Sequence, residues 1–388
     1  MRPLHGLLCA LFALAACNPA NADSTLDYSL GGGRTSNVFR DTTGLASPFS
    51  EGKIALRGSL ALEDSRFAYG LTASVRRIAR YRFADERKAG VEIGYARDLG
   101  EAVELTLKAG IEHRRDGDLF LALPGLLIGY RKADIAAAAS AGLAVEHWDG
   151  KSRLTAALSN LDRGKADFTL RGLPRLRLEA GNRLFELTGG HIRPLLGGEV
   201  GATLQYRTNR IPADDRERFE RLPARTLRGS LAYGRALAGG VTLMAEAGIV
   251  GVDSPGLGGT VDRTRPFLKA ELGWQLSRDT ALKARFARDI RLDDIDDPLG
   301  EDVRTVGLAL ETALTEKLKL ALAYEQARSD WLYYDYQTRT TGATATLSYT
   351  LAKGATVALE YSHLVRRETD EAAGFRVGGL AARFSGSF

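Results

Sequence analysis

The chain has 388 residues, of which 44% are hydrophobic and 26% are charged, and its formal net charge is +5. The basic residues are dispersed and form no block, so composition does not indicate nucleic-acid binding. No run approaches the roughly 20 apolar residues that a membrane-spanning helix needs. The mean hydropathy of −0.16 does not exclude a transmembrane β-barrel, because such a barrel hides its apolar face in every second residue.

Residues 1–22 predict a secretory signal peptide. Arg2 and His5 form a basic start, residues 7–16 an apolar segment, and residues 20–22 (Ala-Asn-Ala) a small-residue cleavage site. The sequence Leu-Ala-Ala-Cys ending at Cys17 also matches a bacterial lipobox, which would leave an acylated Cys17 as the mature N-terminus. Both alternatives predict export. The only two cysteines of the chain lie in this segment, so we expect no disulfide in the mature body.

From residue 25 onward the sequence alternates between apolar and polar or small residues. Residues 53–62 are a clear case, and similar segments of roughly ten residues recur along the chain. A period of two places the two sets on opposite faces of a strand. The polar set is rich in Thr, Ser, Lys, Arg and Glu, as expected of a water-filled lumen. We therefore predict an all-β, transmembrane antiparallel up-and-down β-barrel over residues 23–388, with about 18 strands and 16 as the fallback.

The connections between these segments alternate in length. Short turns, such as 63–66 and 277–280, alternate with longer charged segments, such as 34–51 and 290–303. Short periplasmic turns and longer extracellular loops are the pattern of outer-membrane barrels, so we expect a Gram-negative outer-membrane protein. Residues 176–190 are ambiguous and fit a strand, a loop or an inserted plug.

The six residues after the first predicted strand carry a family resemblance. Thr35-Ser36-Asn37-Val38-Phe39-Arg40 resembles the opening motif of the β-barrel porin 2 family of proteobacterial outer-membrane proteins. The resemblance implies a barrel of unassigned substrate, placed in some members with polysaccharide export, and it implies no catalytic residue.

The third long connection contains an apolar run, residues 119–129. This run could fold into the barrel and narrow the pore. Alternatively, it forms a hairpin that turns at Pro124-Gly125 and prolongs the wall, which is the interpretation we favour.

Charged residues of the polar set would face the lumen and act on solutes. The pore-lining candidates are Arg57, Arg76, Lys108, Arg207, Lys269, Lys283, Arg285, Lys317 and Lys319, with Glu104, Glu112, Glu271, Glu325 and Glu360. The excess of cations favours anions, such as acidic sugars or carboxylates. Alternatively, these charges pair across strands and only stabilise the wall.

The sequence offers little for catalysis or metal binding. His113, His147 and His363 share parity with the apolar set, and no hydrolase or metalloprotease motif is present. The acidic segment 290–302 could bind Ca²⁺, but a solvated loop is the better interpretation. We expect no enzyme activity and no cofactor.

The last strand ends on an aromatic residue. Leu380, Phe384 and Phe388 lie on one face of it and resemble the C-terminal signal that the barrel assembly machinery recognises. Together these features predict a passive pore for small anionic solutes or an exported acidic polysaccharide, in contact with lipopolysaccharide. The alternatives are a barrel enzyme acting on lipid and a structural or adhesin barrel with a plugged lumen.

Overall fold

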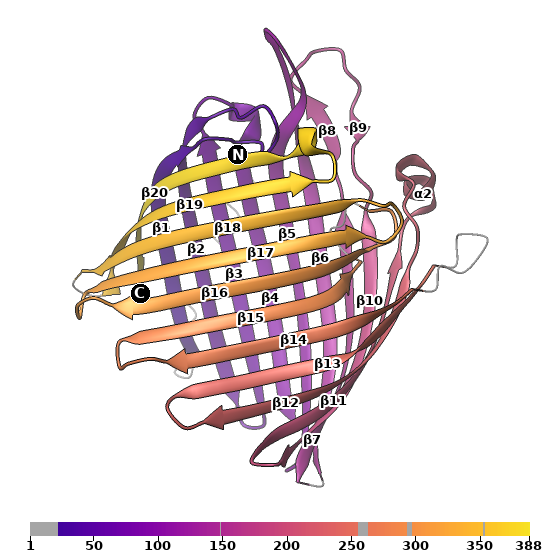
Figure 1. The fold of residues 1–388 in the computed structure, drawn as a ribbon, viewed down its shortest axis with the longest axis vertical. Helices are drawn as coiled ribbons and strands as arrows, with labels where there is room; N and C mark the ends of the chain where they lie inside the picture. The colour runs from indigo at the N-terminus through magenta and orange to yellow at the C-terminus, as the bar shows by residue number, and fades with distance from the viewer. Residues whose placement is uncertain (1–21, 148, 255–262, 293–296, 352–353) are drawn as a thin grey trace.

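The computed structural model describes residues 22–147, 149–254, 263–292, 297–351 and 354–388 (Figure 1). Within these residues, eighteen strands form the wall. They are β1 (Ala22–Thr35), β2 (Ser47–Leu62), β3 (Ser65–Ile78), β4 (Glu86–Asp98), β5 (Val103–Leu123), β6 (Leu126–His147), β7 (Gly150–Asp162), β10 (Asn182–Leu195), β11 (Gly198–Arg210), β12 (Arg225–Leu237), β13 (Val241–Asp253), β14 (Arg263–Gln275), β15 (Thr280–Arg291), β16 (Glu301–Ala313), β17 (Leu318–Trp331), β18 (Gln337–Thr350), β19 (Thr356–Glu368) and β20 (Phe375–Ser387). The predicted signal peptide falls on residues 1–21, outside the described residues, and on Ala22.

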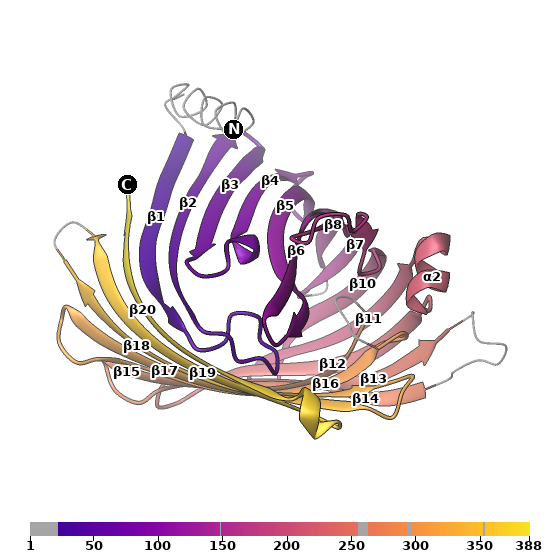
Figure 2. The same ribbon diagram turned by 90° about the horizontal axis from the view of Figure 1, so that it is seen from above.

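The wall closes on itself, as Figure 2 shows from above. Each strand pairs antiparallel with the next, β7 pairs with β10, and β20 returns to pair with β1. At the seam, the Leu26 and Phe388 main chains exchange two hydrogen bonds, both of 3.0 Å. Closure removes the free strand edges that a flat sheet would expose. The predicted antiparallel barrel of 18 strands is confirmed.

The outer face of the wall is apolar. Leu322, Leu347, Leu359 and Leu380, on four neighbouring strands, are each at least 40% exposed. The strands at the front of Figure 1 cross those at the rear steeply, as tilted strands of a closed barrel do. Over the wall, every second side chain therefore points away from the barrel interior.

The two rims differ as predicted. One rim carries short turns, such as the two-residue turn at Leu196 and Gly197, where both residues have positive φ (56° and 71°). A tight turn of this kind needs left-handed backbone, which glycine adopts without strain. The other rim carries the long loops and the short elements β8 (Lys165–Phe168), β9 (Leu176–Arg177), α2 (Ala213–Phe219), η1 (Arg82–Ala84) and η3 (Glu371–Ala373).

The apolar run 119–129 belongs to a hairpin that extends the wall. Strands β4 and β7 stop pairing near Arg115 and Ile135, so residues 116–134 project past both neighbours. The hairpin turns at Gly125, whose φ is 77°. It rises above the long-loop rim in Figure 1. The hairpin interpretation is confirmed.

Residues 176–190 and 207–223 each contain regular secondary structure. Residues 176–190 supply β9 and most of the wall strand β10, rather than a plug. The charged segment 207–223 contains the helix α2. Its Asp215 is buried and accepts a hydrogen bond from the Gly181 main chain at 3.0 Å.

One buried apolar cluster lies at the long-loop rim. Pairing of β15 with β14 stops at Arg288, while its pairing with β16 continues to Arg291. The freed end packs against the inner face of β13 and β14. The cluster contains Ala224, Val250, Val252, Phe267, Ile290, Leu292, Leu299 and Leu332. Beside it, the fully buried Asp297 carboxylate accepts main-chain hydrogen bonds from Leu299, Gly300, Tyr333 and Tyr334. This rim cluster ties two loops together.

The seam makes a direct prediction for Gly33. A Cβ at this position would lie 2.2 Å from the Leu380 carbonyl oxygen. Gly33→Ala should therefore push β1 and β20 apart and lower the free energy of unfolding by about 1–3 kcal/mol. Denaturant unfolding in detergent micelles measures the loss. In the control Gly70→Ala, the new Cβ has only an ordinary 3.8 Å contact. Equal stability of the two variants would contradict the role of the seam.

Candidate functional site: the charged lumen

The strand register places all the predicted pore-lining residues of the strands on one face. Glu271, Arg285 and Glu325, for example, lie in one row across β14 to β17, through Gly307. The other candidates on this face are Arg57, Arg76, Lys108, Arg207, Lys269, Lys283, Lys319, Glu104, Glu112 and Glu360, whereas Lys317 lies in the turn between β16 and β17.

That face is the interior of the barrel. The Arg207 guanidinium on β11 contacts the Asp289 carboxylate on β15 at 3.1 Å, and Arg228 on β12 reaches the same carboxylate at 3.2 Å. Strands that are three and four positions apart in the wall can bring their side chains together only across the lumen. Whether these residues line a conducting pore stays a prediction.

On the β12 to β18 side of the lumen, the charges balance. A cavity of about 950 Å³ there is lined by Glu271, Lys283, Arg285 and Glu325 among others. Lys269 pairs with Glu271 at 3.1 Å, and Arg285 pairs with Glu325. On this side the alternative interpretation, pairing that stabilises the wall, describes the contacts well.

On the β1 to β4 side, the positive charge is in excess. A cavity of about 720 Å³ is lined there by five cations and three carboxylates. Arg57 pairs with Asp27 at 3.7 Å, and Arg383 pairs with Glu51 at 2.8 Å. The remaining lining charges are Lys53, Arg76, Lys88 and Glu86. The lining of this cavity therefore carries two more cations than carboxylates.

The loop after β1 covers the lumen at the long-loop rim. The buried Asn37 side chain donates hydrogen bonds to the main-chain oxygens of Asp41 (2.6 Å) and Arg376 (3.4 Å). The Phe39 ring stacks on Phe83 with the centroids 5.6 Å apart. These contacts hold Arg40 against a further cavity of about 710 Å³.

This role of the first loop was missed by the sequence analysis. The signal was present, because Asn37, Phe39 and Arg40 belong to the motif that carries the family resemblance. In the structure the motif acts as an anchor that fixes an inward loop.

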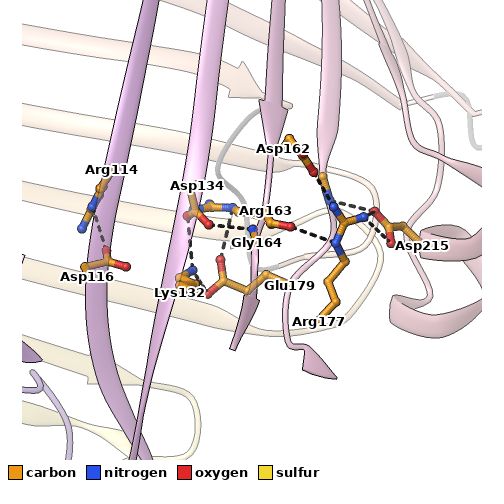
Figure 3. Close-up of polar contacts among 11 residues, drawn as sticks. Arg114, Asp116, Lys132, Asp134, Asp162, Arg163, Gly164, Arg177, Glu179 and Asp215 are labelled. Carbon is orange, nitrogen blue, oxygen red and sulfur yellow. Dashed lines mark hydrogen bonds and ion pairs between the residues drawn. The ribbon is translucent and has the colours of Figure 1, made fainter. Parts of the chain in front are cut away.

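A network of ion pairs holds the segment between β7 and β10 against the inner wall (Figure 3). On β6, Lys132 and Asp134 lie 3.5 Å apart. Asp134 accepts hydrogen bonds from Arg163 at 2.9 Å and from the Gly164 main chain at 3.0 Å. Glu179 pairs with both Lys132 and Arg163. The network therefore joins the two ends of segment 163–181 to one strand.

A second anchor lies beside the first. Arg177 of β9 contacts both carboxylate oxygens of Asp215 at 3.0 and 3.2 Å, and it also pairs with Asp162. In the projecting part of the β5–β6 hairpin, burial raises the pKa of the Asp116 carboxyl group, and the charges of Arg114 and Lys132 oppose that rise.

The acidic segment 290–302 does not form a metal site in its described part. Asp297 binds main-chain N–H groups, Glu301 pairs with Arg291 at 2.6 Å, and Asp302 pairs with Arg288 at 2.6 Å. Asp293, Asp294 and Asp296 lie outside the described residues. In the described parts of the chain, no group of three or more His, Cys, Asp or Glu side chains is arranged to hold a metal ion.

The histidines lie on the outer face, in agreement with their parity. His113 pairs in register with Ile135, and His363 with Ala343. His147 differs because the fold brings it to His191, with Ser152 between them. The Ser152 hydroxyl lies 2.8 Å from His147 Nε2 and 3.0 Å from His191 Nδ1. Sequence separation concealed this cluster.

The residues of the predicted assembly signal also face outward. Leu380, Phe384 and Phe388 are all exposed. The ring of Tyr28 on β1 lies 5.9 Å from that of Phe384 and 5.3 Å from that of Phe388. The terminal strand therefore offers an aromatic edge at the seam.

Comparison with known proteins identifies the fold. The siderophore receptor PirA from Acinetobacter baumannii superposes with a TM-score of 0.54 and 7% identity, over 94% of this chain and 80% of that one. OccK2 (OpdF) from Pseudomonas aeruginosa, in complex with glucuronate, gives a TM-score of 0.51 and 12% identity, over 95% of this chain and 99% of that one. The chain has the fold of outer-membrane β-barrels.

The sequence comparisons add no family. No family model matches the chain, and no curated protein matches it. The resemblance to the β-barrel porin 2 family therefore stays a prediction. Among the described residues, none of the helices has the length and apolar character needed to cross a membrane.

The ion-pair network predicts the effect of Asp134→Asn. Its loss leaves Lys132 and Arg163, both largely buried, without their central carboxylate. The free energy of opening of segment 163–181 should fall by about 3 kcal/mol. Faster hydrogen exchange of the backbone amides in this segment would measure that loss. The control Asp167→Asn removes an exposed ion pair with Arg175 on the same segment. It should change the free energy of opening by less than about 1 kcal/mol. Equal exchange rates in the two variants would refute the anchoring role.

Proposed function

We propose that this protein is an outer-membrane channel through which small anionic solutes diffuse passively. The observation that carries the proposal is the excess of cations on the β1 to β4 side of the lumen, where five cations and three carboxylates line one cavity. Fixed charges along a confined aqueous path raise the local concentration of counter-ions and lower the barrier for them.

The opposite side of the lumen sharpens this selectivity. There Lys269, Glu271, Arg285 and Glu325 are paired and nearly neutral overall. An anion therefore meets a cationic strip along one wall and a polar, neutral surface along the other. Such a path attracts a carboxylate without binding it tightly, so the solute can leave again.

Acidic sugars are the substrate class that fits best. A monosaccharide carboxylate combines one negative charge with many hydroxyl groups, which suit the polar lumen. The structural neighbour OccK2 was solved with glucuronate, a solute of this class. An exported acidic polysaccharide would meet the same charges, and the family resemblance keeps it as the other candidate.

The location follows from the fold under this proposal. An apolar outer face around a charged interior fits a lipid bilayer around an aqueous path. We place the short-turn rim in the periplasm and the long-loop rim outside the cell, in contact with lipopolysaccharide. The barrel assembly machinery would recognise Leu380, Phe384 and Phe388 on the last strand, after removal of the signal peptide.

Selectivity in planar bilayers tests the proposal. The wild-type protein should conduct ions. In a KCl gradient, its reversal potential should have the sign that indicates selectivity for chloride over potassium. The double variant K53E/K88E should move that potential towards the potassium side. The matched control K165E/R171E makes the same change in net charge at two exposed residues of the long-loop rim and should leave selectivity unchanged. A silent barrel, or equal selectivity in all three proteins, would refute the channel proposal.

One observation favours a second candidate, a hydrolase acting at the lipid interface. Ser152 lies on the outer face between two imidazoles, and a hydroxyl beside a histidine is the beginning of a nucleophile–base pair. The channel proposal predicts no ester hydrolysis by the purified protein on phospholipid vesicles. Hydrolysis that is lost in Ser152→Ala and in His147→Ala would transfer the assignment to the enzyme.

A further inference from the structure

Five arginines form a continuous row on one face of β15 to β19, the face that points outward over most of the wall. Register pairs Arg288 with Arg304, Arg304 with Arg328, Arg328 with Arg339, and Arg339 with Arg367. The row therefore crosses five consecutive strands, β15 to β19, without a break. Side chains directly opposite each other on one face of a sheet lie about 5 Å apart at Cβ.

The row lies at the edge of the apolar belt. Each arginine lies within three residues of the long-loop end of its strand. On the same face, towards the other rim, Val306, Leu308, Leu322 and Tyr324 are exposed. In a membrane-spanning barrel this level is where hydrocarbon gives way to lipid headgroups.

The carboxylates in the row are too few to neutralise it. Asp302 pairs with Arg288 at 2.6 Å and also lies 3.8 Å from Arg304 and 3.8 Å from Arg265 on the inner face of β14, so this end of the row is covered by the wall. Asp330 is shared by Arg304 at 3.1 Å and Arg328 at 3.0 Å. Two carboxylates thus serve the first three arginines.

The exposed end of the row has the greater excess of charge. Arg339 donates to the neutral Gln326 amide oxygen at 2.6 Å. Among the described residues, Arg367 has no carboxylate within ion-pair distance, and the Nε of Arg304 is buried without a hydrogen-bond acceptor. Like charges directly opposite each other destabilise a sheet. An anion from outside the chain would relieve this repulsion.

The chemistry of the row selects the kind of anion. Within the described residues, every lysine of the wall strands faces inward, from Lys53 on β2 to Lys319 on β17. The row is built of arginine alone. A guanidinium group presents a planar fork that binds phosphate through two parallel hydrogen bonds, whereas an ammonium group acts as a point charge.

We propose that the arginine row (Arg288, Arg304, Arg328, Arg339 and Arg367) is a binding site for the phosphate groups of lipopolysaccharide in the outer leaflet. Arg328, Arg339 and Arg367 hold the phosphates, and the buried Arg288–Asp302 pair fixes the inner end of the row. Bound lipid would cover the outer face of β17 to β19 and neutralise the positive charge of the row. The inference rests on the membrane location in the proposed function, but not on conductance.

Binding to the full mature chain in detergent micelles tests this site. The probe is purified lipopolysaccharide, compared with the same material after enzymatic removal of its phosphates, with a chelator present to exclude bridging cations. The triple variant R328Q/R339Q/R367Q should bind the phosphorylated probe about 100-fold more weakly. The matched control K269Q/K283Q/K319Q removes the same charge from the lumen and should bind as the wild type does.

A conservative variant separates charge from geometry and guards against misfolding. R328K/R339K/R367K keeps every charge of the fold but loses the forks, and we expect about tenfold weaker binding. Three results would each overturn the proposal: wild-type affinity in both arginine variants, equal loss in the luminal control, or equal binding of the dephosphorylated probe. Conductance of the same variants in neutral-lipid bilayers keeps this test separate from that of the channel.

Discussion

The hydrogen bonding of the peptide backbone is the constraint on which this structure depends. In hydrocarbon no water can satisfy a free N–H or C=O group, so a sheet can cross a bilayer only if its two edges meet. Here the meeting is made between β1 and β20, and its last two hydrogen bonds join Leu26 to Phe388. Gly33 lets the two strands approach closely. The position of the chain end is thus part of the closure of the wall.

Once the wall is closed, successive side chains along each strand point alternately into the lumen and to the outer face of the barrel. Inside, charges such as Arg207 and Asp289 meet across the lumen. Outside, leucines and aromatic residues stand exposed over most of the wall, and arginines take over at the long-loop rim. Within the described wall strands every lysine faces inward, whereas arginines occur both in the lumen and in the outer row. The use of arginine in the outer row fits its chemistry, because a guanidinium fork holds a phosphate while an ammonium group acts as a point charge.

The period of two in the sequence was sufficient to predict the strands of the wall. It was insufficient to predict the loops and short elements at the long-loop rim. A period of two is local information, so residues 53–62 alone define both faces of β2. Contacts between distant segments leave no such trace. Nothing in the sequence near Asp134 indicates that Arg163 and Glu179 belong to the same ion-pair network. Likewise, the seven-residue helix α2 is held through the ion pair between its Asp215 and Arg177, which lies 38 positions away in the chain. Ser152 and His191 are 39 positions apart and meet only because β7 pairs with β10. The Asn37 motif was visible, but its role as an anchor needed the structure.

The central claim is that adjacent residues of one strand face different solvents. The two cysteines of the chain lie within the predicted signal peptide, so single cysteines at Leu322 and Ala323 can carry a fluorescent label in the cleaved protein. After reconstitution in a bilayer, the label at 322 should be quenched by a hydrocarbon-soluble quencher and the label at 323 by an aqueous one. Equal quenching of both labels by either reagent would contradict the account.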